Sequence, residues 1–114
     1  MNKNVLHIES IIGTSNAVIQ KFGNQVFLVA SGLLSKDQSI VLDFSGITNL
    51  TSGFCNASVG KLYSVFPKIA KSHIVITNIE KPSIWNDKIE DSIGLALNPE
   101  KAKIHDEAIL ALFE

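Results

Sequence analysis

Apolar residues along the first forty positions follow two different patterns. A run rich in valine, isoleucine and leucine over Val5–Ile12 predicts a strand. Residues 14–16 are favourable helix N-caps, and after them apolar residues recur at steps of three and four, which predicts a helix. The predicted core stripe of this helix is Phe22, Val26, Val29 and Leu33. Because Gly23 and Gly32 lie inside it, we expect the helix to be irregular or split.

The middle of the chain repeats this alternation. A continuous apolar run over Ser39–Phe44 predicts a strand covered on both faces, as in a parallel sheet. A second helix is predicted from about Ser52 to Phe66, and Pro67 ends it. The predicted core face of this helix is Cys55, Val59, Leu62 and Phe66. A third strand is predicted over His73–Thr77.

A third helix is predicted after Pro82, because proline is well tolerated in a first helical turn. Its core face has a spacing of four and consists of Trp85, Ile89, Ile93 and Leu97. Beyond the Asn98–Pro99 stop, Lys101–Ile104 fits a short edge strand and His105–Phe113 a helix. Strands alternating with amphipathic helices indicate an α/β fold, with a mostly parallel sheet of about four strands and helices packed on it. We expect residues 1–114 to form one such domain.

Composition narrows the function classes. The chain has 114 residues, of which 46% are hydrophobic and 18% charged, as is ordinary for one globular domain. All ten basic residues are lysines and the net charge is −1. The chain thus lacks arginine, whose guanidinium group makes the paired hydrogen bonds typical of nucleic-acid recognition, and we expect no nucleic-acid partner. The longest apolar runs are too short to span a membrane. One cysteine excludes an internal disulfide, and we expect a cytoplasmic protein.

Charge is unevenly distributed along the chain. The charged side chains between Val5 and Phe66 are Glu9, Lys21, Lys36, Asp37, Asp43 and Lys61. The shorter remainder of the chain is much richer in charge. Either the elements of the first part are buried on several sides, or they carry a surface that a partner covers, because the centre of a protein interface is depleted of charge.

The most informative segment is the predicted strand–loop–helix from Ile40 to Leu62. Asp43 ends the strand, Ser45–Gly46 has turn chemistry, and Thr51 and Ser52 precede the helix. The first N–H groups of a helix lack intrahelical partners and attract an anion or a partner that senses one. Asp43 either caps the turn through Ser45–Gly46 or belongs to a recognition surface. Thr51 or Ser52 is expected to be the N-cap.

This segment resembles the central strand–loop–helix of STAS domains, the fold of bacterial anti-sigma-factor antagonists, and is most similar to the STAS-like branch. The resemblance implies a non-enzymatic regulatory module that docks on a histidine-kinase-like ATPase or an anti-sigma factor. The partner-binding residues that it implies are Asp43, Ser45, Gly46, Thr51, Ser52, Gly53 and Phe54. An exposed Phe54 would be the apolar anchor of this contact. Asn56, Ser58 and Lys61 would form its rim.

The resemblance also implies a phosphorylation switch. Anti-sigma-factor antagonists have the sequence Asp-Ser-Ser-Gly-Leu here, which aligns with Thr51–Cys55 of this chain, and their second serine is phosphorylated. That serine aligns with Gly53, which has no hydroxyl. A shift of one residue places Ser52 in the role, so Ser52 and Thr51 are the candidate phosphoacceptors. A phosphate would add negative charge at a helix start and change a nearly neutral surface.

Two other function classes remain open from the sequence. A helix start beside hydroxyls suits a small ligand such as a nucleotide, although arginine and a glycine-rich cradle are missing. An enzyme would need Cys55 or Ser52 as nucleophile, but Cys55 shares the apolar helix stripe and is expected to be buried. His7, His73 and His105 lack metal-ligand spacing, so we expect no metal, cofactor or catalytic residue. The nearly neutral first helix leaves a homodimer open.

Overall fold

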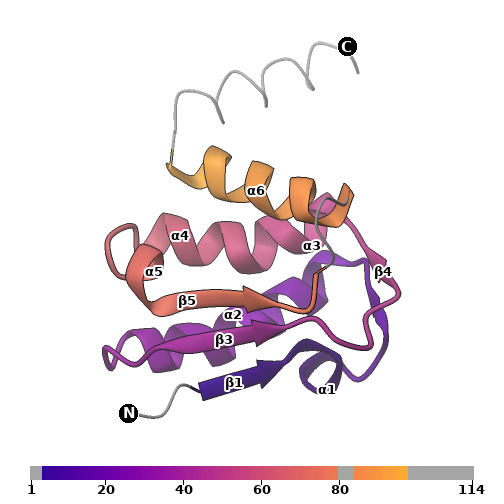
Figure 1. Cartoon of the computed structure of the whole chain (residues 1–114), viewed down its shortest axis with the longest axis horizontal. Coiled ribbons are helices and arrows are strands. Elements are labelled where there is room, and N and C mark those ends of the chain that lie inside the picture. The colour runs from indigo at the N-terminus through magenta and orange to yellow at the C-terminus, as the bar shows by residue number, and fades with distance from the viewer. Residues whose placement is uncertain (1–3, 80–83, 98–114) are drawn as a thin grey trace.

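Three parallel strands form the main sheet, in the order β1–β3–β5. They are β1 (Asn4–His7), β3 (Ile40–Asp43) and β5 (Ile74–Thr77). A second, two-residue parallel ladder pairs β2 (Asn16–Ala17) with β4 (Asn49–Leu50). The computed structural model describes residues 4–79 and 84–97 (Figure 1). Within them the predicted α/β fold with a mostly parallel sheet is confirmed.

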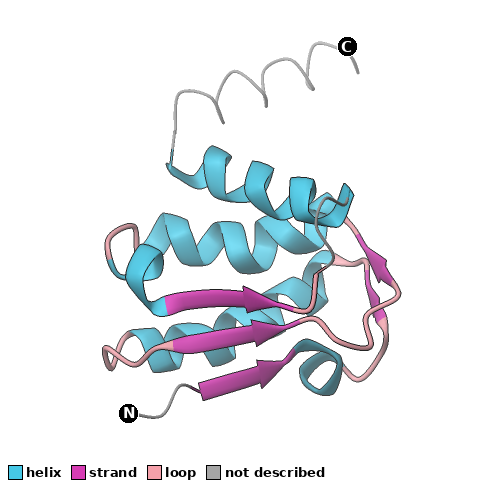
Figure 2. Cartoon of the chain, viewed as in Figure 1, coloured by secondary structure: helices cyan, strands magenta, loops and turns pink. Residues whose placement is uncertain are grey.

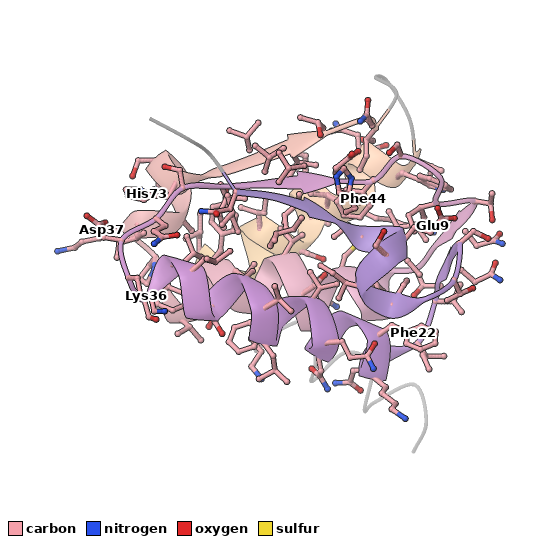
Figure 3. All side chains as sticks on the ribbon, turned by 90° about the horizontal axis from the view of Figure 1, so that it is seen from below. Glu9, Phe22, Lys36, Asp37, Phe44 and His73 are labelled. Carbon is pink, nitrogen blue, oxygen red and sulfur yellow. The ribbon has the colours of Figure 1, made fainter. Side chains whose placement is uncertain are left out.

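Helices cover one face of this sheet. Figure 2 shows α2 (Gln20–Leu34) behind the strands, with α4 (Lys61–Val65) and α6 (Ile84–Leu97) beyond β5. The side chains of Ile40, Leu42 and Ile74 are buried beneath these helices, whereas those of Val5 and Val75 are exposed on the opposite face. Figure 3 shows that opposite face without a covering helix. The architecture is therefore a sheet with one helical layer.

The first predicted strand is too long. β1 ends at His7, and a short helix, α1 (Ile8–Ile12), replaces its second half. Ile8 and Ile12 are spaced by four and are both buried, which is a helical period rather than a strand period. Gly13 ends α1 in the left-handed region at φ 75°, and its N–H donates to the carbonyl of Glu9.

The first long helix starts later than predicted. Residues 14–16 are not its cap, because the carbonyl of Ser15 accepts the N–H of Thr48 beside the β2–β4 ladder. α2 runs without interruption, so the expected irregularity at the glycines is wrong. Its buried stripe is Gly23, Val26, Ala30 and Leu34. Val29 is exposed and Phe22 and Leu33 are half-buried, so the predicted stripe is rotated from the observed one.

The second predicted helix is confirmed as one helical segment with a π-helical turn inside it. It consists of α3 (Ser52–Cys55), the π-helix η1 (Asn56–Gly60) and α4. Cys55, Val59 and Leu62 are fully buried as predicted, and Phe66 just beyond is half-buried. Another short helix, α5 (Ile69–His73), then leads into β5. The expected third helix is α6, in which Ile89 is buried, Trp85 and Ile93 are half-buried and Leu97 is exposed.

Several predictions on the C-terminal part concern residues that the structure does not describe. These are Pro82 at a helix start, the stop at Asn98–Pro99, the edge strand Lys101–Ile104 and the helix His105–Phe113. They stay predictions. Among the described residues, no helix is both long and apolar enough to cross a bilayer.

Candidate functional site

Asp43 is the centre of a polar cluster at the carboxyl end of the main sheet. Its carboxylate accepts the N–H of Ser45 at 3.0 Å and the side-chain amide of Asn78 at 2.6 Å. These two hydrogen bonds, the Asn78 bond first, lower the pKa of the buried Asp43 from 3.8 to about 2. The capping role expected for Asp43 is therefore confirmed at Ser45, and the carboxylate is charged at neutral pH.

His7 is the third partner of this carboxylate. The register places His7 opposite Asp43 on adjacent strands, and His7 Nδ1 lies 2.9 Å from Asp43 Oδ2. Because an ionised carboxylate only accepts hydrogen bonds, Nδ1 of His7 is the donor in this pair. The His7 side chain is 59% exposed. This pair was missed from the sequence, although both residues end strands, and carboxyl ends of parallel strands share one edge.

Asp43→Asn is predicted to destabilise the protein at neutral pH and much less in acid. The pKa of Asp43 is lower in the folded protein than its ordinary value of 3.8, so its contribution is complete above that value. It is lost as pH falls from about 3.8 towards about 2. We expect a loss of about 1–2 kcal/mol at pH 7, which shrinks as pH falls below about 3.8 and approaches zero only below about pH 2. Urea unfolding of both proteins across this range measures it.

Asp37→Asn is the matched control for this experiment. The Asp37 carboxylate pairs with His73 at 3.0 Å, but its side chain is largely exposed. Exposed ion pairs contribute about 0–1 kcal/mol, so this variant should unfold almost as the wild type does. A pH-independent loss for Asp43→Asn would contradict the assigned role of the charged carboxylate.

The turn after Asp43 is shaped by Gly46. Its φ of 84° lies in the left-handed region, which favours glycine. The Glu9 carboxylate packs against it, since a Cβ at position 46 would lie 2.6 Å from Glu9 Oε1. Ser45 and Gly46 are both exposed, so the turn forms part of the surface.

Thr51 is the N-cap of α3, as one of the two candidates was expected to be. Its hydroxyl accepts the N–H of Phe54 at 3.3 Å and donates to the carbonyl of Val18 at 2.9 Å. Ser52 and Gly53, the first two helical residues, are exposed. Phe54 is fully buried, so the expectation that it is an exposed anchor is wrong. It lies beneath the helix start because α3 packs on α2.

The expected rim is only partly at the surface. Asn56 is exposed, and its side-chain oxygen accepts the hydroxyl of Ser92 at 2.6 Å. Lys61 is exposed and places Nζ 4.4 Å from the centroid of the Phe27 ring. Ser58 is fully buried and donates to the carbonyl of Phe54 at 2.8 Å, so its assignment to the rim is wrong.

The expectation that Cys55 is buried is confirmed. Burial raises the pKa of the Cys55 thiol from 9.0 to about 12, which leaves almost no thiolate at neutral pH. The two histidines within residues 4–79 are both hydrogen-bonded to aspartates, His7 to Asp43 and His73 to Asp37. The described part of the chain contains no group of three or more potential metal-ligating side chains. A cysteine nucleophile is thus disfavoured on chemical grounds.

Two segments without charged side chains meet at this end of the molecule. Residues 10–20 and 44–60 contain no acidic, basic or histidine side chain. The ladder aligns Asn16 with Asn49, and the side chains of these two residues hydrogen-bond. We define the neutral surface as nine exposed residues of these segments: Asn16, Val18, Ile19, Ser45, Gly46, Thr48, Asn49, Ser52 and Gly53. The sequence did not lead us to include residues around β2 in the candidate site, although the lack of charged side chains in residues 10–20 could have indicated them.

Comparison with known proteins identifies the family. A model of a STAS-like domain of unknown function (DUF4325) matches residues 28–83, which include the whole strand–loop–helix segment. No curated protein and no solved structure matches the chain. The resemblance drawn from residues 40–62 is confirmed, since residues 28–83 match the model of a STAS-like domain.

Proposed function

We propose that this STAS-like domain is a non-enzymatic regulatory module that binds another protein through the neutral surface. By the family resemblance, the partner is a histidine-kinase-like ATPase or an anti-sigma factor. The observation that carries the proposal is the meeting of two uncharged, exposed segments at the β2–β4 ladder. A charge-depleted surface of this kind costs little to desolvate, as at the centre of protein interfaces.

The neutral surface contains apolar as well as polar contacts. Val18 and Ile19 are exposed on its β2 side. Ser52 and Gly53 border them from the helix start, because the Thr51 hydroxyl is bonded to the Val18 carbonyl. In this proposal Val18 and Ile19 supply the apolar contact first assigned to Phe54, while hydroxyls and amides supply directional hydrogen bonds.

Ile19→Lys is predicted to weaken partner binding by about tenfold or more, because it places an unpaired charge in the interface. Titration calorimetry against a purified histidine-kinase-like ATPase or anti-sigma factor from the same organism measures the effect. Val75→Lys is the matched control, since Val75 is also a β-branched apolar residue, is 38% exposed against 44% for Ile19, and lies on the open sheet face. Equal affinities of the two variants would contradict the proposal.

The proposed switch is phosphorylation of Ser52. The Thr51 hydroxyl makes two hydrogen bonds within the protein, whereas Ser52 is exposed at the first turn. A phosphate there adds about −1.5 to −2 charge to a segment, residues 44–60, that has no charged side chain of its own. Intact mass after incubation with the same ATPase tests the switch, with Ser52→Ala as control. An unchanged mass of the wild-type protein removes the switch and leaves the binding proposal standing.

A further inference from the structure

An apolar patch with positive charge lies on the outer side of α2 and α4. α2 lies against the continuous helical segment of η1 and α4, because Gly23 packs against Ala57 of η1 and Lys61 of α4 lies over the ring of Phe27. Leu28, next to Phe27 along α2, is 69% exposed. Val65, one turn after Lys61, is 53% exposed. We call Phe27, Leu28, Lys61 and Val65 the basic patch.

α2 carries Lys21, the segment from α3 to α4 carries Lys61, and α5 carries Lys71, and these three stretches contain neither aspartate nor glutamate. α6, which packs on α4, carries Asp87, Glu90 and Asp91. The α2 side of the helical layer is therefore more positive than the α6 side. A partner surface that covers Leu28 would bind more tightly if it had an apolar residue surrounded by carboxylates.

α6 presents the complementary surface. Ile84, Asp87 and Asp91 are spaced by three and four, which places them on one face of the helix, and all three are exposed. Ile84 is 67% exposed, so Leu28 and Ile84 are the two most exposed large apolar side chains of the described residues. We call these three residues the acidic face. The opposite side of α6 packs into the protein through the buried Ile89 and Ser92.

We propose that the basic patch of one copy of this chain binds the acidic face of a second copy. Leu28 and Ile84 would pack against each other while Asp87 and Asp91 approach Lys61. The segment from α3 to α4 contacts both α2 and α6 and lies between them, so each copy keeps one surface free when the other is occupied. Because the two surfaces differ, the contact is heterologous and builds rings or chains rather than a closed two-fold dimer.

Sedimentation velocity of the full chain tests the association. We expect the sedimentation coefficient to rise with concentration between about 10 μM and 1 mM, as for weak contacts of small area. Added salt should lower it at fixed concentration, because exposed charges are screened. A wild-type chain that stays monomeric throughout, as it would if its own residues 98–114 covered either surface, overturns the proposal.

Two single variants then distinguish this contact from any symmetric one. Leu28→Ser removes the basic patch and Ile84→Ser the acidic face, and each is expected to lower the association constant by about tenfold or more. Mixed in equal amounts, they should form a heterodimer and nothing larger, since only one complementary pair of surfaces remains. Val75→Ser, on the open sheet face, should associate as the wild type does.

The opposite results are equally clear. If Ile84→Ser still self-associates while Leu28→Ser does not, the basic patch pairs with itself and the heterologous contact is wrong. If both variants associate as the wild type does, neither surface is involved. Binding of the ATPase or anti-sigma partner by both variants is measured separately, because the neutral surface contains neither residue.

Discussion

Phe54→Ala is expected to lower the free energy of unfolding by about 3–5 kcal/mol, the usual loss for a phenylalanine removed from a core. Phe54 is fully buried in the first turn of α3, where α3 packs on α2. Its carbonyl oxygen also accepts the hydroxyl of Ser58 and lies against Gly23, so the backbone around it is tightly held and relaxes little into a cavity. Urea unfolding at pH 7 measures the loss.

Phe54→Leu is the control, because it keeps most of the apolar volume and should lose only about 1–1.5 kcal/mol. The folded fraction of both variants should still bind the partner with wild-type affinity, since Phe54 offers no surface to it. If Phe54→Ala unfolds like the wild type but loses partner binding, the original expectation of an exposed anchor is right and the buried position is wrong.

The sequence predicts the main elements because their apolar patterns are long and regular. The continuous run that ends at Asp43 identifies the central strand, and the stripe of Cys55, Val59 and Leu62 identifies the helix after it. Both lie inside the segment that carries the family resemblance. The parallel direction of the strands then follows from the alternation of strands and helices, because each helix returns the chain to the same end of the sheet. Such crossovers are right-handed and place the helices on a face of the sheet.

The site is less predictable because it depends on contacts between distant segments. The β2–β4 ladder has two residues per strand, too few for any periodic signal. The His7–Asp43 pair requires knowledge of strand register. Phe54 and Ser58 are buried beside the predicted stripe because the helix lies between α2 and α6 and is covered on two sides. Periodicity indicates one buried face and does not reveal a second.

The second large predicted effect concerns the two glycines of α2. Replacing each of them by alanine is expected to change the free energy of unfolding in opposite directions. Alanine is favoured over glycine in a helix interior by about 0.5–1 kcal/mol, so propensity alone predicts that both replacements stabilise α2. At Gly32 no atom lies within 4 Å of the added Cβ, and we expect the full gain for Gly32→Ala. Thermal or urea unfolding of each variant measures the change.

At Gly23 the same methyl group has no room. Its Cβ would lie 2.7 Å from the backbone oxygen of Phe54 and 2.7 Å from Cβ of Ala57, and neither atom belongs to a flexible side chain. Gly23→Ala must therefore push α2 away from the helix that follows β4, and we expect a net loss of about 1–3 kcal/mol despite the better propensity. A stabilised Gly23→Ala protein would mean that the two helices are further apart than described. Opposite signs of the change in unfolding free energy at Gly23 and Gly32 would show that Gly23 is required by the close approach of α2 to the helix after β4, rather than by chain flexibility. The same close approach would then hold the start of that helix, with Ser52 and Gly53, in place.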